Sequence, residues 1–251
     1  MLVAYDGTDF HGWARQPSAR TVQGVMEAAL APLLGGRAPR LSVAGRTDAG
    51  VHAFGQVVSF EASVSLDPTH VQRALNGVLA PEVVVRDARR APAGFDARFS
   101  ARAREYRYRI DTAPLPDPFT ARFVWHRPGR LAVVAMRRAA RDLTGEHDFA
   151  SFCRAPAPPA GTVRRVEGLA VSAADDLVDV RVRANAFCHQ MVRSVVGTLV
   201  AVGDGRIDAG AMPAILAARS RSAAGRIAPP HGLTLVRVVY GAGGRTIGAD
   251  L

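Results

Sequence analysis

The chain has 251 residues, of which 48% are hydrophobic and 22% charged, and its net charge is +10. This length predicts one large domain or two small ones with a core that needs no disulfides. The apolar content excludes a largely disordered chain. No apolar run approaches the roughly 18 residues of a membrane span. Because the sequence contains no lysine, the excess charge is arginine, whose planar fork of donors fits phosphate, so we expect a polyanionic partner, either nucleic acid or an anionic membrane surface.

The hydrophobic pattern alternates between the period of strands and the period of helices, which predicts a mixed α and β protein. Residues 1–100 form a predicted first half. In chain order its elements are a helix capped by Thr21 and reaching Leu33, a strand at 41–44, a loop at 45–50 with glycine at both ends, a strand at 56–60, a helix beginning at Pro68 behind the cap Asp67, and a strand at 82–86.

Residues 101–240 form the predicted second half. In chain order its elements are a strand at 102–111, a helix at 131–143, a proline-rich extended loop at 155–159, two hairpin strands at 163–171 and 176–184, a long helix ending near Gly203, a short helix from Asp208 and a strand at 233–240. Residues 241–251 contain four glycines and are predicted to be a flexible tail. Two α/β halves of similar length are compatible with an internal duplication, although no exact repeat is visible.

The loop at 45–50, with the sequence Gly-Arg-Thr-Asp-Ala-Gly, carries the most informative chemistry. A cation near Asp48, such as Arg46, would favour the ionised carboxylate, and an ionised aspartate acts as nucleophile or general base. On spacing alone, a simpler interpretation is favoured, in which Asp48 caps a turn and Arg46 is a solvated neighbour.

Six segments of the sequence resemble, in the same order, the motifs of the bacterial tRNA pseudouridine synthase A family. They are residues 5–13 (Tyr-Asp-Gly-Thr-Asp-Phe-His-Gly-Trp), 45–52 (Gly-Arg-Thr-Asp-Ala-Gly-Val-His), 104–108 (Arg-Glu-Tyr-Arg-Tyr), 145–152, 185–193 and 232–235. Any one of them alone is weak, but together they cover nearly the whole chain and are specific.

The resemblance implies an α+β fold of two similar halves, whose antiparallel sheets are flanked by helices and border a basic active-site cleft. The implied reaction is the isomerisation of uridine to pseudouridine at positions 38, 39 and 40 of the tRNA anticodon stem-loop. It detaches uracil from ribose at N1 and rejoins it through C5, so neither a redox cofactor nor ATP is needed. The family is homodimeric, with a tRNA lying across both subunits.

The resemblance also assigns site residues. Asp48 is the catalytic aspartate, which either attacks the sugar or assists the departure of the base. Tyr106 stacks on the uracil and serves in removing the C5 proton, whereas on the strand pattern alone it is a core aromatic, the interpretation we keep for Tyr108. Arg193 is expected to pair with Asp48, against the alternative of a surface arginine. Arg46 is expected to hold the flipped target nucleotide, with a plain phosphate contact as the open alternative.

Further arginines predict a basic patch that follows an RNA backbone. They are Arg98, Arg102, Arg104, Arg107 and Arg109 on and before one strand, and Arg137, Arg138 and Arg141 on the following helix. Two rival functions remain at this point. A non-catalytic RNA-binding module predicts a degraded Asp–Tyr–Arg set, and an aspartate-dependent hydrolase normally needs a second carboxylate.

Cysteine and histidine usage points to no metal and no disulfide framework. His147, Cys153, Cys188 and His189 match no compact zinc spacing, so we expect structural thiols and core histidines. Buried thiols and the lack of a secretory-type opening lead us to expect a cytoplasmic protein. The sequence departs from the family's usual motifs at Ala14 and at residues 188–190. None of these is a matched catalytic position, so the departures concern how the substrate is positioned and leave the expected reaction the same.

Overall fold

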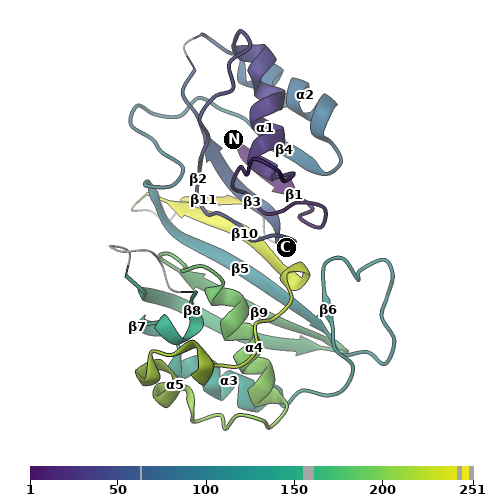
Figure 1. Cartoon of the computed structure of the whole chain (residues 1–251), viewed down its shortest axis with the longest axis vertical. Coiled ribbons are helices and arrows are strands. Elements are labelled where there is room, and N and C mark those ends of the chain that lie inside the picture. The colour runs from purple at the N-terminus through teal and green to yellow at the C-terminus, as the bar shows by residue number, and fades with distance from the viewer. Residues whose placement is uncertain (63, 155–160, 242–244, 249–251) are drawn as a thin grey trace. The chain divides into compact units, whose positions relative to one another are not determined.

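The computed structural model describes residues 1–62, 64–154, 161–241 and 245–248, and the chain forms two compact units (Figure 1). The first contains Met1–Arg104 and Thr234–Leu251, and the second contains Glu105–Leu233. The last predicted strand, which the sequence analysis places in the second half, therefore belongs to the first unit. Both units combine a mostly antiparallel sheet with helices, which confirms the α+β class. Among the described residues, no helix is both long and apolar enough to cross a membrane.

In the first unit, four strands form the sheet in the order β4-β1-β3-β10, with β2 beside β3 and β11 beside β10. The pairs are antiparallel except β3 with β10. The strands are β1 (Leu2–Tyr5), β2 (Ser42–Val43), β3 (His52–Ser59), β4 (Val83–Asp87), β10 (Leu233–Tyr240) and β11 (Arg245–Gly248). The helices α1 (Val22–Leu30) and α2 (Pro68–Leu79) pack side by side, and a 3-10 turn η1 (Ala31–Leu34) follows α1 (Figure 1).

The predicted caps begin both helices of the first unit. The Thr21 hydroxyl accepts a hydrogen bond from Gly24 N–H (3.2 Å), and the Asp67 carboxylate accepts from the N–H groups of Thr69 and His70 (both 3.2 Å). Side-chain oxygens at these positions satisfy donors that the first helical turn leaves without partners. The starts of α1 and α2 are therefore determined by local sequence.

In the second unit, the sheet order is β5-β9-β8-β7, with the short β6 parallel to β5. The strands are β5 (Ala101–Asp111), β6 (Trp125–His126), β7 (Gly145–Asp148), β8 (Val163–Ala174) and β9 (Leu177–Ala184). The helices are α3 (Val133–Asp142), α4 (Met191–Gly203) and α5 (Met212–Ala218), with 3-10 turns η2 (Ala150–Phe152), η3 (Arg221–Ala223) and η4 (Pro230–Gly232). Helix α3 packs against β8 and α4 (Figure 1).

Several boundaries differ from the sequence predictions. Helix α1 ends at Leu30 because Pro32 lies in the next turn and forces a 3-10 geometry. Strand β3 starts at His52 and not at residue 56. It includes Gly55, where an added Cβ would lie 2.0 Å from the Val236 carbonyl oxygen, so the glycine lets β10 lie close beside β3.

Part of the segment predicted to be a flexible tail forms a strand. Arg245–Gly248 form β11, which pairs in antiparallel register with β10 from Arg237 to Tyr240. Gly241, with a φ of +74°, stands directly after β10. The glycine content of the segment predicts flexibility, and a strand of only four residues leaves no local signal in the sequence. The rest of the tail after Gly241 (242–244 and 249–251) and the proline-rich loop at 155–159 lie outside the described residues.

Candidate active site

Residues 5–13, called here the N-terminal segment, lie directly against residues 45–50, called the aspartate loop. Trp13 N–H donates to the Thr47 carbonyl (3.0 Å), and Gly50 N–H donates to the Phe10 carbonyl (3.2 Å). Gly12 has a φ of +88°, and a Cβ there would lie 2.8 Å from the Thr47 carbonyl oxygen. Two of the motifs in the sequence analysis are therefore one structure, and glycine is required where they meet.

A buried polar network supports the aspartate loop from the sheet. Gln56, on β3, is fully buried, and its Nε2 donates to the Gly45 carbonyl (2.6 Å) and to Tyr5 Oη (3.3 Å). The hydroxyls of Tyr5 and Thr47 are 2.8 Å apart. Burial raises the pKa of Tyr5 to about 12, although its hydrogen bonds to Thr47 and Gln56 oppose the shift, so the hydroxyl stays protonated. These bonds hold the aspartate loop at Gly45 and at Thr47.

Arg104 fixes the residue just before the loop. Its Nε and one Nη donate to the Ala44 carbonyl (2.9 and 2.7 Å). The sequence predicts Arg104 only as part of a basic patch and indicates no role for Tyr5 or Gln56, whereas in the structure all three support the loop. For Tyr5 the signal was its place in the first motif. A glutamine inside a strand carries no such signal.

Asp48 lies on a backbone that is held in place while its side chain is only half-buried. The neighbouring residues alternate, with Arg46 exposed, Thr47 buried and Ala49 exposed. The Asp48 carbonyl accepts from Val51 N–H (3.2 Å), which closes a turn around Gly50, where φ is +74°. A carboxylate presented in this way can meet a ligand without a conformational change of the loop.

In the second unit, Tyr106 is 7% exposed on β5, and its ring meets the ring of Phe187 edge-on at 5.2 Å. Phe187 lies in the segment that leads into α4. Tyr108, two residues further on, is fully buried and its hydroxyl donates to the Pro229 carbonyl (2.8 Å). A Cβ at Gly232 would lie 2.6 Å from the Tyr108 ring. The core interpretation of Tyr108 is confirmed.

Arg193 is half-buried in the first turn of α4, which contradicts the alternative of a solvated surface arginine. Its Nε donates to the Ala228 carbonyl (2.8 Å), and Ala228 N–H donates back to the Arg193 carbonyl (3.1 Å). Gly197 permits this approach, because a Cβ there would lie 1.7 Å from the Arg226 carbonyl oxygen. Burial and the charge of Arg193 together lower the pKa of His231. The guanidinium therefore has a fixed orientation.

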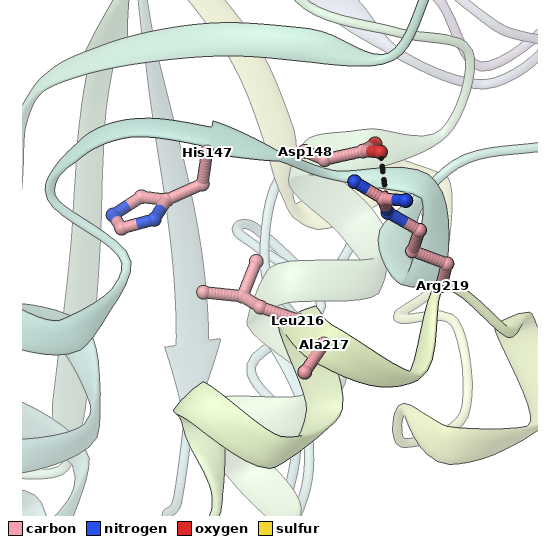
Figure 2. A pocket seen from close by; sticks show the side chains of 5 residues that line it. All are labelled: His147, Asp148, Leu216, Ala217 and Arg219. Atoms are coloured by element: carbon pink, nitrogen blue, oxygen red, sulfur yellow. Dashed lines mark ion pairs between the residues drawn. The ribbon is translucent and has the colours of Figure 1, made fainter.

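A separate open pocket of about 380 Å³ lies between β7 and α5 (Figure 2). Its lining residues are His147, Asp148, Leu216, Ala217 and Arg219. The Asp148 carboxylate accepts from Arg219 Nε (2.9 Å), from Ala150 N–H (3.1 Å) and from the Thr162 hydroxyl. These bonds give the Asp148 carboxylate its partners within the chain, so we assign no ligand to the pocket.

The structure gives each predicted site residue a place within its own unit. Asp48 and Arg46 share the aspartate loop of the first unit, while Tyr106 and Arg193 belong to the second. The expected pairing of Asp48 with Arg193 stays a prediction. Cys153 and Cys188 are buried and free. Within the described residues, no three side chains among His, Cys, Asp and Glu come together as metal ligands.

The similarity to known proteins extends over most of the chain. The profile of a family described as tRNA pseudouridine synthase matches residues 1–100 and 139–241. A protein from Halalkalibacterium halodurans named tRNA pseudouridine synthase A is 46% identical over 233 residues, which cover 93% of this chain and 89% of that protein. A protein of the same name from Frankia casuarinae is 49% identical over 242 residues, covering 95% of this chain and 87% of the relative.

Among solved structures, the chain aligns with a chain in a crystal structure of a Cbf5-Nop10-Gar1 complex, covering 94% of this chain and 57% of that one. The sequence identity is 13% and the TM-score is 0.35, which is too low to support an argument.

Proposed function

Since the chain belongs to the tRNA pseudouridine synthase family, we propose that it isomerises uridine to pseudouridine at positions 38, 39 and 40 in the anticodon stem-loop of tRNA. One observation carries the proposal. Asp48, in the family's aspartate motif, stands half-buried on a loop whose backbone is held by Trp13, Gln56 and Arg104. Such pre-organisation is what a reaction at a buried glycosidic carbon requires.

The reaction conserves all atoms of the uridine. The bond between N1 and C1′ breaks, the base turns in the site, a bond forms between C5 and C1′, a proton leaves C5 and N1 gains a proton. Asp48 acts as nucleophile on the sugar, or it assists the departure of the base. No electrons are transferred, so we propose that the enzyme needs no redox cofactor, ATP or metal.

Tyr106 and Arg193 complete the proposed catalytic set. Tyr106 stacks on the uracil and serves in removing the C5 proton, with Phe187 holding its ring edge-on. Arg193 pairs with Asp48. A cation in the first turn of a helix is unfavourable with respect to the helix dipole, and a half-buried guanidinium calls for a carboxylate partner. Both facts favour a functional reason for Arg193 at this position. Arg46, which is exposed, holds the flipped nucleotide.

The proposed partner is tRNA, and the proposed assembly is a homodimer in the cytoplasm. The net charge of +10, carried by arginines, is suited to binding a phosphate backbone. A unit of this size covers only part of a tRNA, so two copies acting together explain how a long substrate is positioned.

The test follows tritium release from tRNA labelled at uridine C5, with Asp48→Ala and the isosteric Asp48→Asn beside the wild type. Isomerisation must expel the C5 hydrogen, whereas binding alone cannot. We expect release by the wild type and none by either variant, with tRNA affinity within a few-fold of the wild type.

Two other outcomes would reject the proposal. A wild type that binds unmodified tRNA but releases no tritium is an RNA-binding module. Uracil that appears free in solution, and is not retained in the RNA, identifies a hydrolase.

A further inference from the structure

Residues 95–100, called here the Phe99 turn, are anchored firmly to the first unit. The Asp96 carboxylate accepts hydrogen bonds from the N–H groups of Arg98 (2.7 Å) and Phe99 (2.9 Å) and from the Ser42 hydroxyl (2.9 Å). The Ala97 carbonyl accepts a hydrogen bond from the Tyr240 hydroxyl (2.7 Å). The backbone of the turn is therefore fixed to β2 and β10.

This rigid turn presents an aromatic ring to solvent. The Phe99 side chain is 79% exposed, and the Arg98 guanidinium lies 5.2 Å from the centre of its ring. A single exposed apolar side chain needs no explanation on most surfaces. Here, however, the backbone that carries the ring is held in place, so little conformational entropy is lost when a flat ligand covers it. The adjacent positive charge favours a ligand that is both aromatic and anionic.

The Phe99 turn is joined to the aspartate loop through one guanidinium. An Nη of Arg104 donates both to the Arg98 carbonyl (2.9 Å) and to the Ala44 carbonyl (2.7 Å). Ala44 is the residue directly before the loop that carries Asp48. The exposed ring and the exposed Arg46 thus belong to segments that the same side chain holds together within the first unit.

We propose that Phe99, with Arg98 beside it, is a stacking platform for an unpaired nucleobase of the RNA substrate near the target uridine. The inference rests on the proposed function and makes Phe99 a positioning residue. Nucleobases stack on exposed aromatic rings regardless of sequence, and a neighbouring arginine contacts the phosphate. A platform that tolerates any base suits an enzyme that must accept the different sequences around three target positions.

The experiment compares Phe99→Ala, Phe99→Leu and Phe99→Trp. Phe119→Ala is the matched control, because Phe119 is 92% exposed in the second unit. Three quantities are measured for each variant: the Kd for an anticodon stem-loop RNA by filter binding, and the KM and kcat of tritium release from full tRNA. We expect Phe99→Ala and Phe99→Leu to raise Kd and KM about tenfold with kcat nearly unchanged. Phe99→Trp should bind as the wild type does, and Phe119→Ala should change none of the three constants.

The design separates this inference from the proposed function, because the binding arm does not depend on catalysis. If the wild type releases no tritium, the stem-loop affinities still test the platform. An unchanged Kd in Phe99→Ala overturns the inference, as does a Phe99→Leu variant that binds like the wild type, since leucine keeps the apolar area but not the stacking face. A Phe99→Ala variant that dissociates in sedimentation equilibrium also overturns it, by identifying the ring as a contact between two copies of this chain.

Discussion

The contact between Gly12 and the aspartate loop allows a direct test of how Asp48 is positioned. Gly12→Ala adds a Cβ at a φ of +88°, 2.8 Å from the Thr47 carbonyl oxygen and 3.1 Å from Ala49 N. The backbone conformation alone costs about 1–2 kcal/mol for an L-residue. Because the neighbouring atoms belong to the backbone, the loop must shift by a few tenths of an ångström, which costs about 1–3 kcal/mol more.

Gly36 provides a matched control for this substitution. It has nearly the same φ, +87°, but a Cβ there would meet nothing within 4 Å. Gly36→Ala should therefore show the backbone cost alone, and the difference in unfolding free energy between the two variants, measured in urea, should be about 1–3 kcal/mol. We also expect Gly12→Ala to lower kcat at least tenfold with little change in KM, since misplacing a reacting group by about 1 Å costs about a hundredfold. Equal stability and equal kcat in the two variants would refute this account of the loop.

Three further results follow from the described contacts. Gln56→Leu removes the donor to the Gly45 carbonyl and should lower the unfolding free energy by about 1–3 kcal/mol, which urea unfolding measures; an unchanged value would mean that the buried network does not hold the loop. Hydrogen bonds, led by that of the Thr162 hydroxyl, lower the pKa of Asp148, so Asp148 stabilises the fold above its usual pKa of about 4 and this stability is lost as pH falls through the lowered value. The difference in unfolding free energy between wild type and Asp148→Asn should accordingly shrink as pH falls from about 5 to about 2, and a constant difference would contradict the assignment. A hydrogen bond from the Cys153 thiol lowers the pKa of Cys188, so alkylation of Cys188 should begin at a lower pH than that of an ordinary thiol and move to higher pH in Cys153→Ala; an unchanged pH profile in Cys153→Ala would contradict the hydrogen bond.

Elements with local signals were predicted well from the sequence. The Thr21 and Asp67 caps act on donors two or three residues away, so the starts of α1 and α2 follow from adjacent residues. The alternation on β5 was also informative. Its buried aromatic face contains Tyr106 and Tyr108, while Arg107 on the other face is paired with Asp179. In each case the physics that decides the structure lies within one element.

Contacts between distant segments explain what the sequence did not reveal. Nothing in the sequence around Gln56 indicates a structural role for its side chain. In the structure this side chain donates hydrogen bonds to the Gly45 carbonyl, 11 residues earlier, and to the Tyr5 hydroxyl, 51 residues earlier. The parallel pairing of β10 with β3 brings the last strand into the first unit, although its sequence reads only as one more apolar strand. Strand β11 has four residues and pairs with residues 237–240 of β10, beyond the two residues of β10 that pair with β3, so it depends on a partner that is distant from any signal of its own.

The aspartate loop shows why the matched motifs contain more residues than the proposed catalytic set. The strand that enters it, β2, has two residues and cannot by itself fix the backbone of Asp48. The loop instead depends on donors from elsewhere, with Trp13 bonded to Thr47, Gln56 to Gly45 and Arg104 to Ala44. In the proposed mechanism, none of these three donors acts on the substrate. Their contribution is geometric, so loosening any of them should lower kcat before it raises KM. The N-terminal segment is therefore part of the scaffold of the aspartate loop, although it is separated from Asp48 by more than 30 residues of chain.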